Sequence, residues 1–94
     1  MIGSSMQRRE LLYTGNVQGV GFRYTARRIA QGHRVAGFVR NLRDGRVQIV
    51  VEGQPGEIDA FLSDLRARMG EYIRSVTDDK MAPTGEFTGF EISY

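Results

Sequence analysis

The chain has 94 residues, of which 40% are hydrophobic and 26% are charged, with a formal net charge of +2; this is typical of one ordinary water-soluble domain, which we expect to span residues 1–94. It has no cysteine, which excludes disulfides, thiolate metal ligands and a cysteine nucleophile, and is compatible with the cytoplasm, where we expect the protein to act. No apolar run is long enough to cross a membrane, and the first nine residues lack the apolar stretch of a signal peptide, so we expect no membrane partner.

The charges are unevenly distributed along the chain. Residues 1–46 hold nine basic and two acidic side chains, whereas residues 47–94 hold four basic and nine acidic ones, so the halves carry +7 and −5. The basic half favours a local positive field that would attract an anion. For Arg27, Arg28 and Arg34 taken singly, a solvated protein surface is an equally good interpretation.

The first half predicts a strand, a helix and a β-hairpin, after initial residues that we expect to be disordered through about Met6. A weak alternation indicates a strand over Glu10–Thr14, followed by a helix that begins near Phe22 and ends at Gly32. Two further strands are expected over Val35–Leu42 and from Val47 to Val51. The Asp44-Gly45 pair between them is a strong hairpin signal.

The second half predicts one more helix and two more strands. The helix begins at Pro55 and ends at Gly70, and its apolar residues recur with an amphipathic period. A strand is expected over Tyr72–Lys80, and Phe90, Ile92 and Tyr94 alternate along a short last one. The order βαββαβ, with two helices on one face of a mainly antiparallel sheet, is the ferredoxin-like plait of the α+β class. That fold hosts many functions and does not identify one.

The glycine-rich run from Gly15 to Arg23 is the strongest functional signal. Glycines permit the positive φ angles of an anion-binding loop, and the helix that follows attracts anions at its N-terminus. Arg23 lies where the helix dipole disfavours a cation, so a bound anion would explain it. The run is neither a dinucleotide fingerprint, since Tyr24 replaces the third glycine, nor a Walker A loop.

Other reactive groups are scarce in the sequence. His33, the single histidine, follows the end of the first predicted helix and is interpreted as a surface or capping residue. No two carboxylates are placed as an acid/base pair, and no cluster suggests a metal. We therefore expect no metal and no cofactor.

Two motifs resemble those of the acylphosphatase family. The first is Val17-Gln18-Gly19-Val20 followed by Phe22-Arg23; the second is Gly37-Phe38-Val39-Arg40-Asn41, with Gly45, Val47 and Gly53 at the expected spacing. They lie about thirty residues apart in the right order. The resemblance extends over nearly the whole chain, through the second helix to the residues after Phe90.

The resemblance implies hydrolysis of acyl phosphates to a carboxylate and inorganic phosphate. In that family the motif arginine, here Arg23, binds the phosphoryl group together with loop amides, and the motif asparagine, here Asn41, positions the attacking water. The substrate-binding loop residues are then Gln18, Gly19, Val20, Gly21 and Phe22. A carboxylate leaving group has a pKa of about 4 to 5, so it departs without a general acid, which this chain does not offer.

Two other interpretations stay open. One is a nucleic-acid-binding plait that uses the basic half, but Arg46–Glu52 has no stacking aromatic residue and includes an acid. The other is an acylphosphatase-like module of a larger carbamoyl-transferring enzyme. We expect a free-standing, monomeric enzyme that acts on a small acyl phosphate and does not bind nucleic acid.

Overall fold

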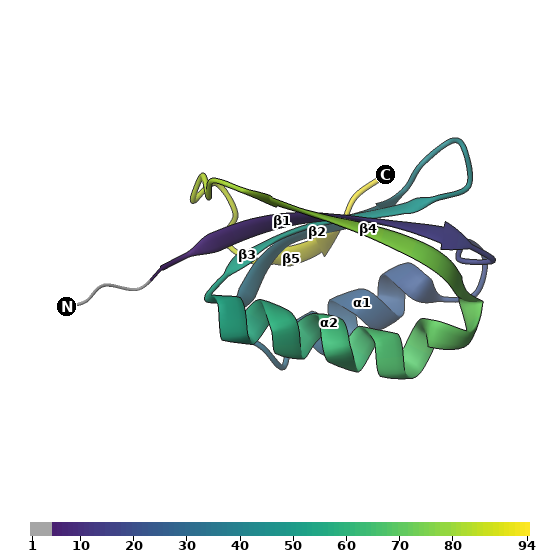
Figure 1. Ribbon diagram of the computed structural model, residues 1–94, viewed down its shortest axis with the longest axis horizontal. Helices are drawn as coiled ribbons and strands as arrows, with labels where there is room; N and C mark the ends of the chain where they lie inside the picture. Colours follow the sequence, from purple (N-terminus) through teal and green to yellow (C-terminus); the bar gives the residue numbers. More distant parts are fainter. Residues whose placement is uncertain (1–4) are drawn as a thin grey trace.

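A computed structural model describes residues 5–94 as a five-stranded sheet with two helices packed on one face (Figure 1). The expected disorder near the N-terminus concerns mostly residues 1–4, which lie outside the described part; Ser5 and Met6 have no regular structure. In chain order the elements are β1 (Gln7–Gly15), α1 (Phe22–Ala30), β2 (Val35–Asn41), β3 (Val47–Gly53), α2 (Pro55–Met69), a 3-10 turn (Gly70–Tyr72), β4 (Ile73–Met81) and β5 (Phe90–Ile92).

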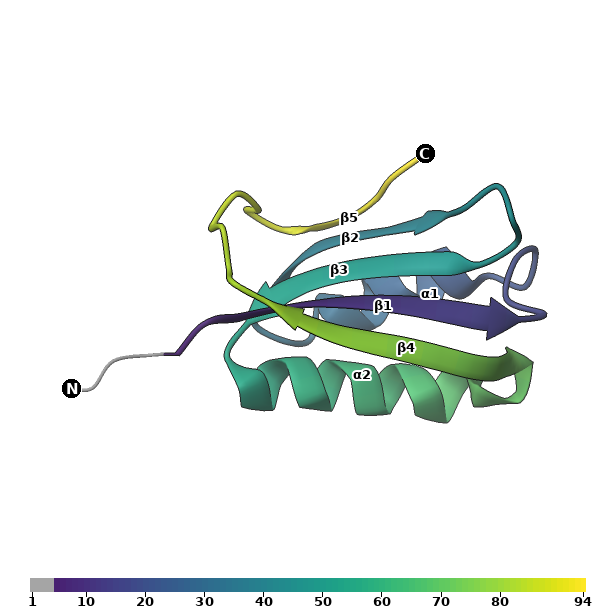
Figure 2. The same ribbon diagram turned by 45° about the horizontal axis from the view of Figure 1, so that its top comes forward.

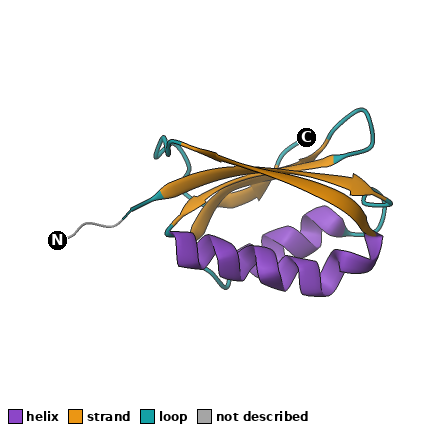
Figure 3. Cartoon of the chain, viewed as in Figure 1, coloured by secondary structure: helices purple, strands orange, loops and turns teal. Residues whose placement is uncertain are grey.

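The strand order β4-β1-β3-β2-β5 is visible when the sheet is tilted forward (Figure 2). The β1 strand lies antiparallel to both β3 and β4, and β2 lies antiparallel to β3. Only β5 joins in parallel, next to β2. The predicted ferredoxin-like plait, α+β with a mainly antiparallel sheet, is confirmed; Figure 3 shows the layer of helices on one side of it.

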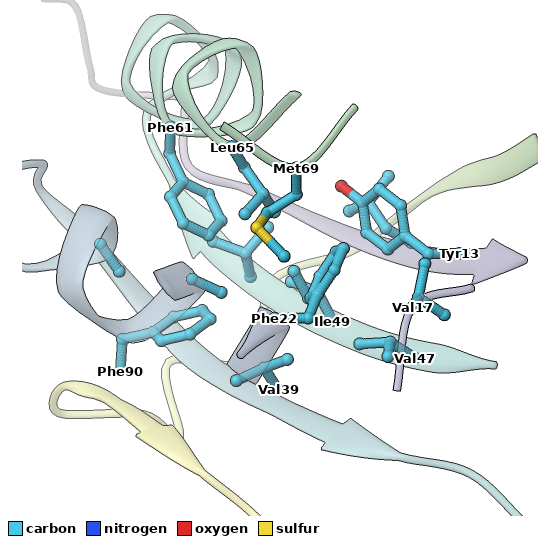
Figure 4. Close-up of a cluster of buried hydrophobic side chains, with 14 of the residues drawn as sticks. Tyr13, Val17, Phe22, Val39, Val47, Ile49, Phe61, Leu65, Met69 and Phe90 are labelled. Carbon is cyan, nitrogen blue, oxygen red and sulfur yellow. The ribbon is translucent and has the colours of Figure 1, made fainter. Parts of the chain in front are cut away.

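The core lies between this sheet and the two helices. The inward-facing residues of β3 are Val47, Ile49 and Val51, all fully buried, as alternation along a strand requires. Figure 4 shows Phe22 of α1 and Phe61 of α2 pointing into the same cluster. The Phe22 ring lies 5.0 Å from the Tyr13 ring, and the Phe61 ring lies 5.3 Å from the Phe90 ring.

Part of the opposite sheet face is covered by the segment between β4 and β5. Its Phe87 packs edge-on against Phe38 of β2, with 5.9 Å between ring centroids. The buried carboxylate of Glu52 on β3 accepts hydrogen bonds from the backbone amides of Thr84 and Gly85, at 2.9 and 3.0 Å. A buried charge is stable only when paired in this way, so Glu52 fixes the segment to the sheet.

The element boundaries differ from the predicted ones in three places. The first strand runs from Gln7 rather than Glu10, because its outer residues pair with both β3 and β4. The first helix ends at Ala30, before Gly32, and the last strand ends at Ile92. The predicted alternation through Tyr94 is therefore wrong: Tyr94 lies beyond the strand and is 87% exposed.

Candidate active site

The loop between β1 and α1 turns on two glycines in the left-handed region. Gly19 has a φ of 78° and Gly21 has a φ of 81°, which side chains with a Cβ rarely adopt. A Cβ at either position would meet no atom within 4 Å, so backbone conformation rather than crowding favours glycine there. Within residues 5–94 the amides of residues 17–21 donate no hydrogen bond to another protein atom. The loop thus presents unpaired donors at the start of α1, where an anion is favoured.

Arg23 lies in the first turn of α1 and is half-buried. Its guanidinium forms no ion pair with any acid in the described part of the chain. Its Cζ lies 5.2 Å from the centre of the Tyr94 ring, which is within cation–π range. The aromatic face supports the guanidinium and leaves its five N–H donors available to a ligand.

Asn41 is the last residue of β2 and faces the helices. It lies two positions after the buried Val39 and therefore points to the same side of the sheet. Its partner across the hairpin is Val47. The side-chain Oδ1 of Asn41 is buried and has no hydrogen-bond partner among residues 5–94. Because such an atom is costly to leave unpaired, it points to a missing donor such as water.

Gln18 joins the loop to the β2–β3 hairpin. Its Nε2 donates to the Leu42 carbonyl at 2.8 Å and to the Arg46 carbonyl at 3.0 Å. The two segments accordingly lie at the same end of the molecule, on the right of Figures 1 and 2. The Gln18 side chain is used in this contact, which brings the loop next to Asn41.

A surface hollow of about 210 Å³ lies where these segments meet. Its lining residues come from the loop, the first turn of α1 and the end of β2: Val17, Gly19, Gly21, Phe22, Arg23, Tyr24 and Asn41. Pockets for drug-sized ligands hold about 300 to 1,000 Å³, so this one suits a smaller group such as a phosphate. No carboxylate lines it, which leaves the field of Arg23 and the amides unopposed there.

The hollow brings together Arg23, Asn41 and most of the predicted loop residues. Gln18 and Val20 do not line it, because the Gln18 side chain binds the hairpin and the Val20 side chain packs against the core. Phe22 lines it only in part, since its side chain is 2% exposed and lies in the core. Sequence reasoning missed Val17 and Tyr24 as lining residues. Their positions flanking the motif glycines were the only signal for them.

The remaining reactive groups lie elsewhere. His33 is not part of the hollow; its Nε2 lies 2.8 Å from Asp64 Oδ2, which connects the end of α1 to α2. Within residues 5–94 no group of three histidine, aspartate or glutamate side chains is placed to hold a metal ion. Neither helix in that range combines the length and the apolar character needed to span a membrane.

Comparison with known proteins gives one consistent result. The acylphosphatase family model matches residues 9–92. The chain is 40% identical over 87 residues to the acylphosphatase of Archaeoglobus fulgidus, covering 90% of this chain and 96% of that protein. It is 43% identical over 90 residues to the acylphosphatase of Methylococcus capsulatus, covering 93% and 96%.

A solved structure agrees with these relatives. The crystal structure of acylphosphatase from Bacillus subtilis matches with a TM-score of 0.81 at 28% identity, covering 96% of this chain and all of that one. The family match includes the glycine-rich loop, Arg23 and Asn41. The chain therefore belongs to the acylphosphatase family.

Proposed function

We propose that this chain hydrolyses the carboxyl–phosphate bond of acyl phosphates, with Arg23 and the loop amides binding the phosphoryl group and Asn41 positioning the attacking water. Membership of the acylphosphatase family supports the reaction. One observation carries the residue assignment: a guanidinium without an ion pair and a buried amide oxygen without a partner line the same small hollow.

The phosphoryl group is held by charge and by directed donors. The planar fork of Arg23 matches two phosphate oxygens, and the amides of residues 19–21 can reach the others. Because these donors are already fixed by the loop and by α1, they stabilise the charge on the equatorial oxygens without rearranging during the reaction.

The attacking water is held by Asn41. An amide oxygen accepts a hydrogen bond, so Asn41 Oδ1 would take one water hydrogen and orient a lone pair of the water toward phosphorus. Asn41 cannot act as a general base in this way; its contribution is positional. The Gln18 hydrogen bonds support this arrangement, since they hold the loop against the hairpin that carries Asn41.

The reaction balances without a protein acid or base. A bond forms between the water oxygen and phosphorus, and the bond from phosphorus to the acyl oxygen breaks, with its electron pair leaving on the carboxylate. A proton of the water passes to a phosphate oxygen, which gives inorganic phosphate. A carboxylate has a pKa of about 4 to 5 and departs unprotonated at neutral pH, which agrees with a hollow that no carboxylate lines.

The test compares hydrolysis of benzoyl phosphate with that of para-nitrophenyl phosphate, in excess EDTA, with inorganic phosphate as a competitor. We expect fast, EDTA-resistant and phosphate-inhibited cleavage of the acyl phosphate alone. If neither compound is cleaved, or if EDTA abolishes cleavage, the proposal is wrong.

We further infer that the protein acts in the cytoplasm as a monomer. The absence of cysteine is compatible with a reducing compartment. The edge strand β4 carries Asp78, Asp79 and Lys80, charges that oppose pairing with a second sheet, and the other edge, β5, has three residues. Cell fractionation and light scattering test the two statements separately; a secreted protein or a stable dimer would contradict them.

A further inference from the structure

The geometry of the proposed displacement leaves one lining residue for the acyl group. Attacking and leaving oxygens lie roughly in line through phosphorus, so the acyl group departs on the side away from the water. Arg23 and Asn41 are used by phosphate and water, and Val17 and Phe22 are buried in the core. Tyr24 remains, and its side chain is 63% exposed.

Tyr24 also lines a second hollow, on the outer surface of α1. The other lining residues are Thr25, Arg27, Arg28 and Gln31 of α1 and Arg68 of α2. Residues three and four apart on a helix lie on one face, so Tyr24 stands next to both Arg27 and Arg28. Because Tyr24 belongs to both hollows, a group that leaves the phosphate site past its ring enters a groove lined by three arginines.

The charges in this groove are poorly neutralised. Within residues 5–94 neither Arg28 nor Arg68 forms an ion pair, and Arg27 has only a weak one, with 3.9 Å between its Nε and Glu91 Oε1. The nearest acid on α2 is Asp64, one turn before Arg68, and its carboxylate is bound to His33. An anion in the groove therefore meets two cations that have no competing partner.

We propose that this groove is an acyl-side subsite that selects acyl phosphates whose acyl group carries a second anionic group. The inference rests on the proposed function and adds the substrate class. Arg28 and Arg68 bind the distal anion, and the Tyr24 ring contacts the connecting part of the acyl group. Both arginines are exposed, so each contributes a modest preference of about two- to fivefold.

The experiment compares para-sulfobenzoyl phosphate with para-nitrobenzoyl phosphate. Both substituents withdraw electrons, but only the sulfonate carries a charge, so the ratio of their kcat/KM values reports the subsite. In Arg28→Gln/Arg68→Gln we expect the ratio to fall about threefold or more. In Arg34→Gln/Arg74→Gln, which removes two exposed arginines outside the groove, we expect the wild-type ratio.

Salt gives a second readout on the wild-type enzyme. Because the groove is open to solvent, screening should lower the same ratio as sodium chloride increases. An unchanged ratio in Arg28→Gln/Arg68→Gln, or an equal fall in the control variant, would overturn the subsite while benzoyl phosphate hydrolysis still supported the proposed function. A wild-type protein that does not hydrolyse benzoyl phosphate would overturn the proposed function and the subsite with it.

Discussion

Asn41 has the most specific proposed role of any single residue, because its buried Oδ1 has no partner in the described part of the chain. Replacing it by alanine removes the acceptor that holds the water and leaves Arg23 in place. We therefore expect Asn41→Ala to lower kcat by about 10²–10³ while inhibition by inorganic phosphate stays close to normal. Steady-state kinetics on benzoyl phosphate measure both quantities.

A matched control is Asn16→Ala, since the exposed Asn16 side chain forms no hydrogen bond within residues 5–94. We expect that variant to keep its turnover. Normal turnover in Asn41→Ala would show that the water is held by another group.

Arg23 should show the opposite pattern, in which binding fails first. Its guanidinium is the charged donor of the hollow, and charged hydrogen bonds are worth about 1.5–3 kcal/mol. We expect Arg23→Ala to weaken phosphate binding about 10- to 100-fold and nearly to abolish turnover. Arg23→Lys should recover part of the binding, since lysine keeps the charge without the planar fork.

The exposed Arg74 on β4 supplies the control for charge alone, as Arg74→Ala. Titration of each variant with inorganic phosphate, followed by calorimetry, gives the dissociation constants. Equal phosphate affinity in wild type and Arg23→Ala would contradict the assignment.

At the scale of elements, local pattern predicted the helices, the hairpin and the glycine loop, because each depends on neighbouring residues. The αL conformations of Gly19 and Gly21 fall where the glycines predicted a turn. The contact of Gln18 with Leu42 and Arg46 was not predictable, since it joins residues 24 and 28 positions apart and no local period encodes it. Tyr94 continued an alternating pattern, yet β5 ends before it and its ring lies beside Arg23.

The Gln18 contact makes the β1–α1 loop and the β2–β3 hairpin one unit. Gln18→Leu keeps the size of the side chain and removes both hydrogen bonds. We expect the loop and Asn41 to lose their relative position, with kcat falling about tenfold or more, because small misplacements of reacting groups are costly. Loss of two hydrogen bonds also lowers the free energy of unfolding by about 1–3 kcal/mol.

Gln48 separates these two effects. It is also half-buried and also bridges elements, with hydrogen bonds to Glu10 at 2.6 Å and from Arg40 at 2.7 Å, but it lies on the sheet face opposite the helices. Gln48→Leu should lower stability and leave kcat unchanged. An equal loss of kcat in both variants would mean that Gln18 acts only through general stability.

At the scale of the whole molecule, Glu52 couples the sheet to the segment between β4 and β5. Besides the two backbone amides, its carboxylate binds the Arg8 guanidinium at 2.8 Å. Burial raises the pKa of this carboxyl, but the hydrogen bonds from Thr84, Arg8 and Gly85 outweigh burial and lower the pKa from 4.5 to about 2. The ionised form is therefore the one that the folded state prefers.

This preference predicts a pH dependence of stability with a defined sign. Because the pKa is lower in the folded state, the stabilisation by Glu52 is complete above about pH 4.5 and is lost as the pH falls toward 2. Glu52→Gln should lower the free energy of unfolding by about 1–3 kcal/mol at neutral pH, and the difference from wild type should shrink in acid. Urea unfolding across this range measures it, with the exposed Glu71→Gln as the control. A difference that stayed constant from neutral pH to about pH 3 would mean that the charge of Glu52 does not fix the segment, and that packing of Phe87 on Phe38 does so instead.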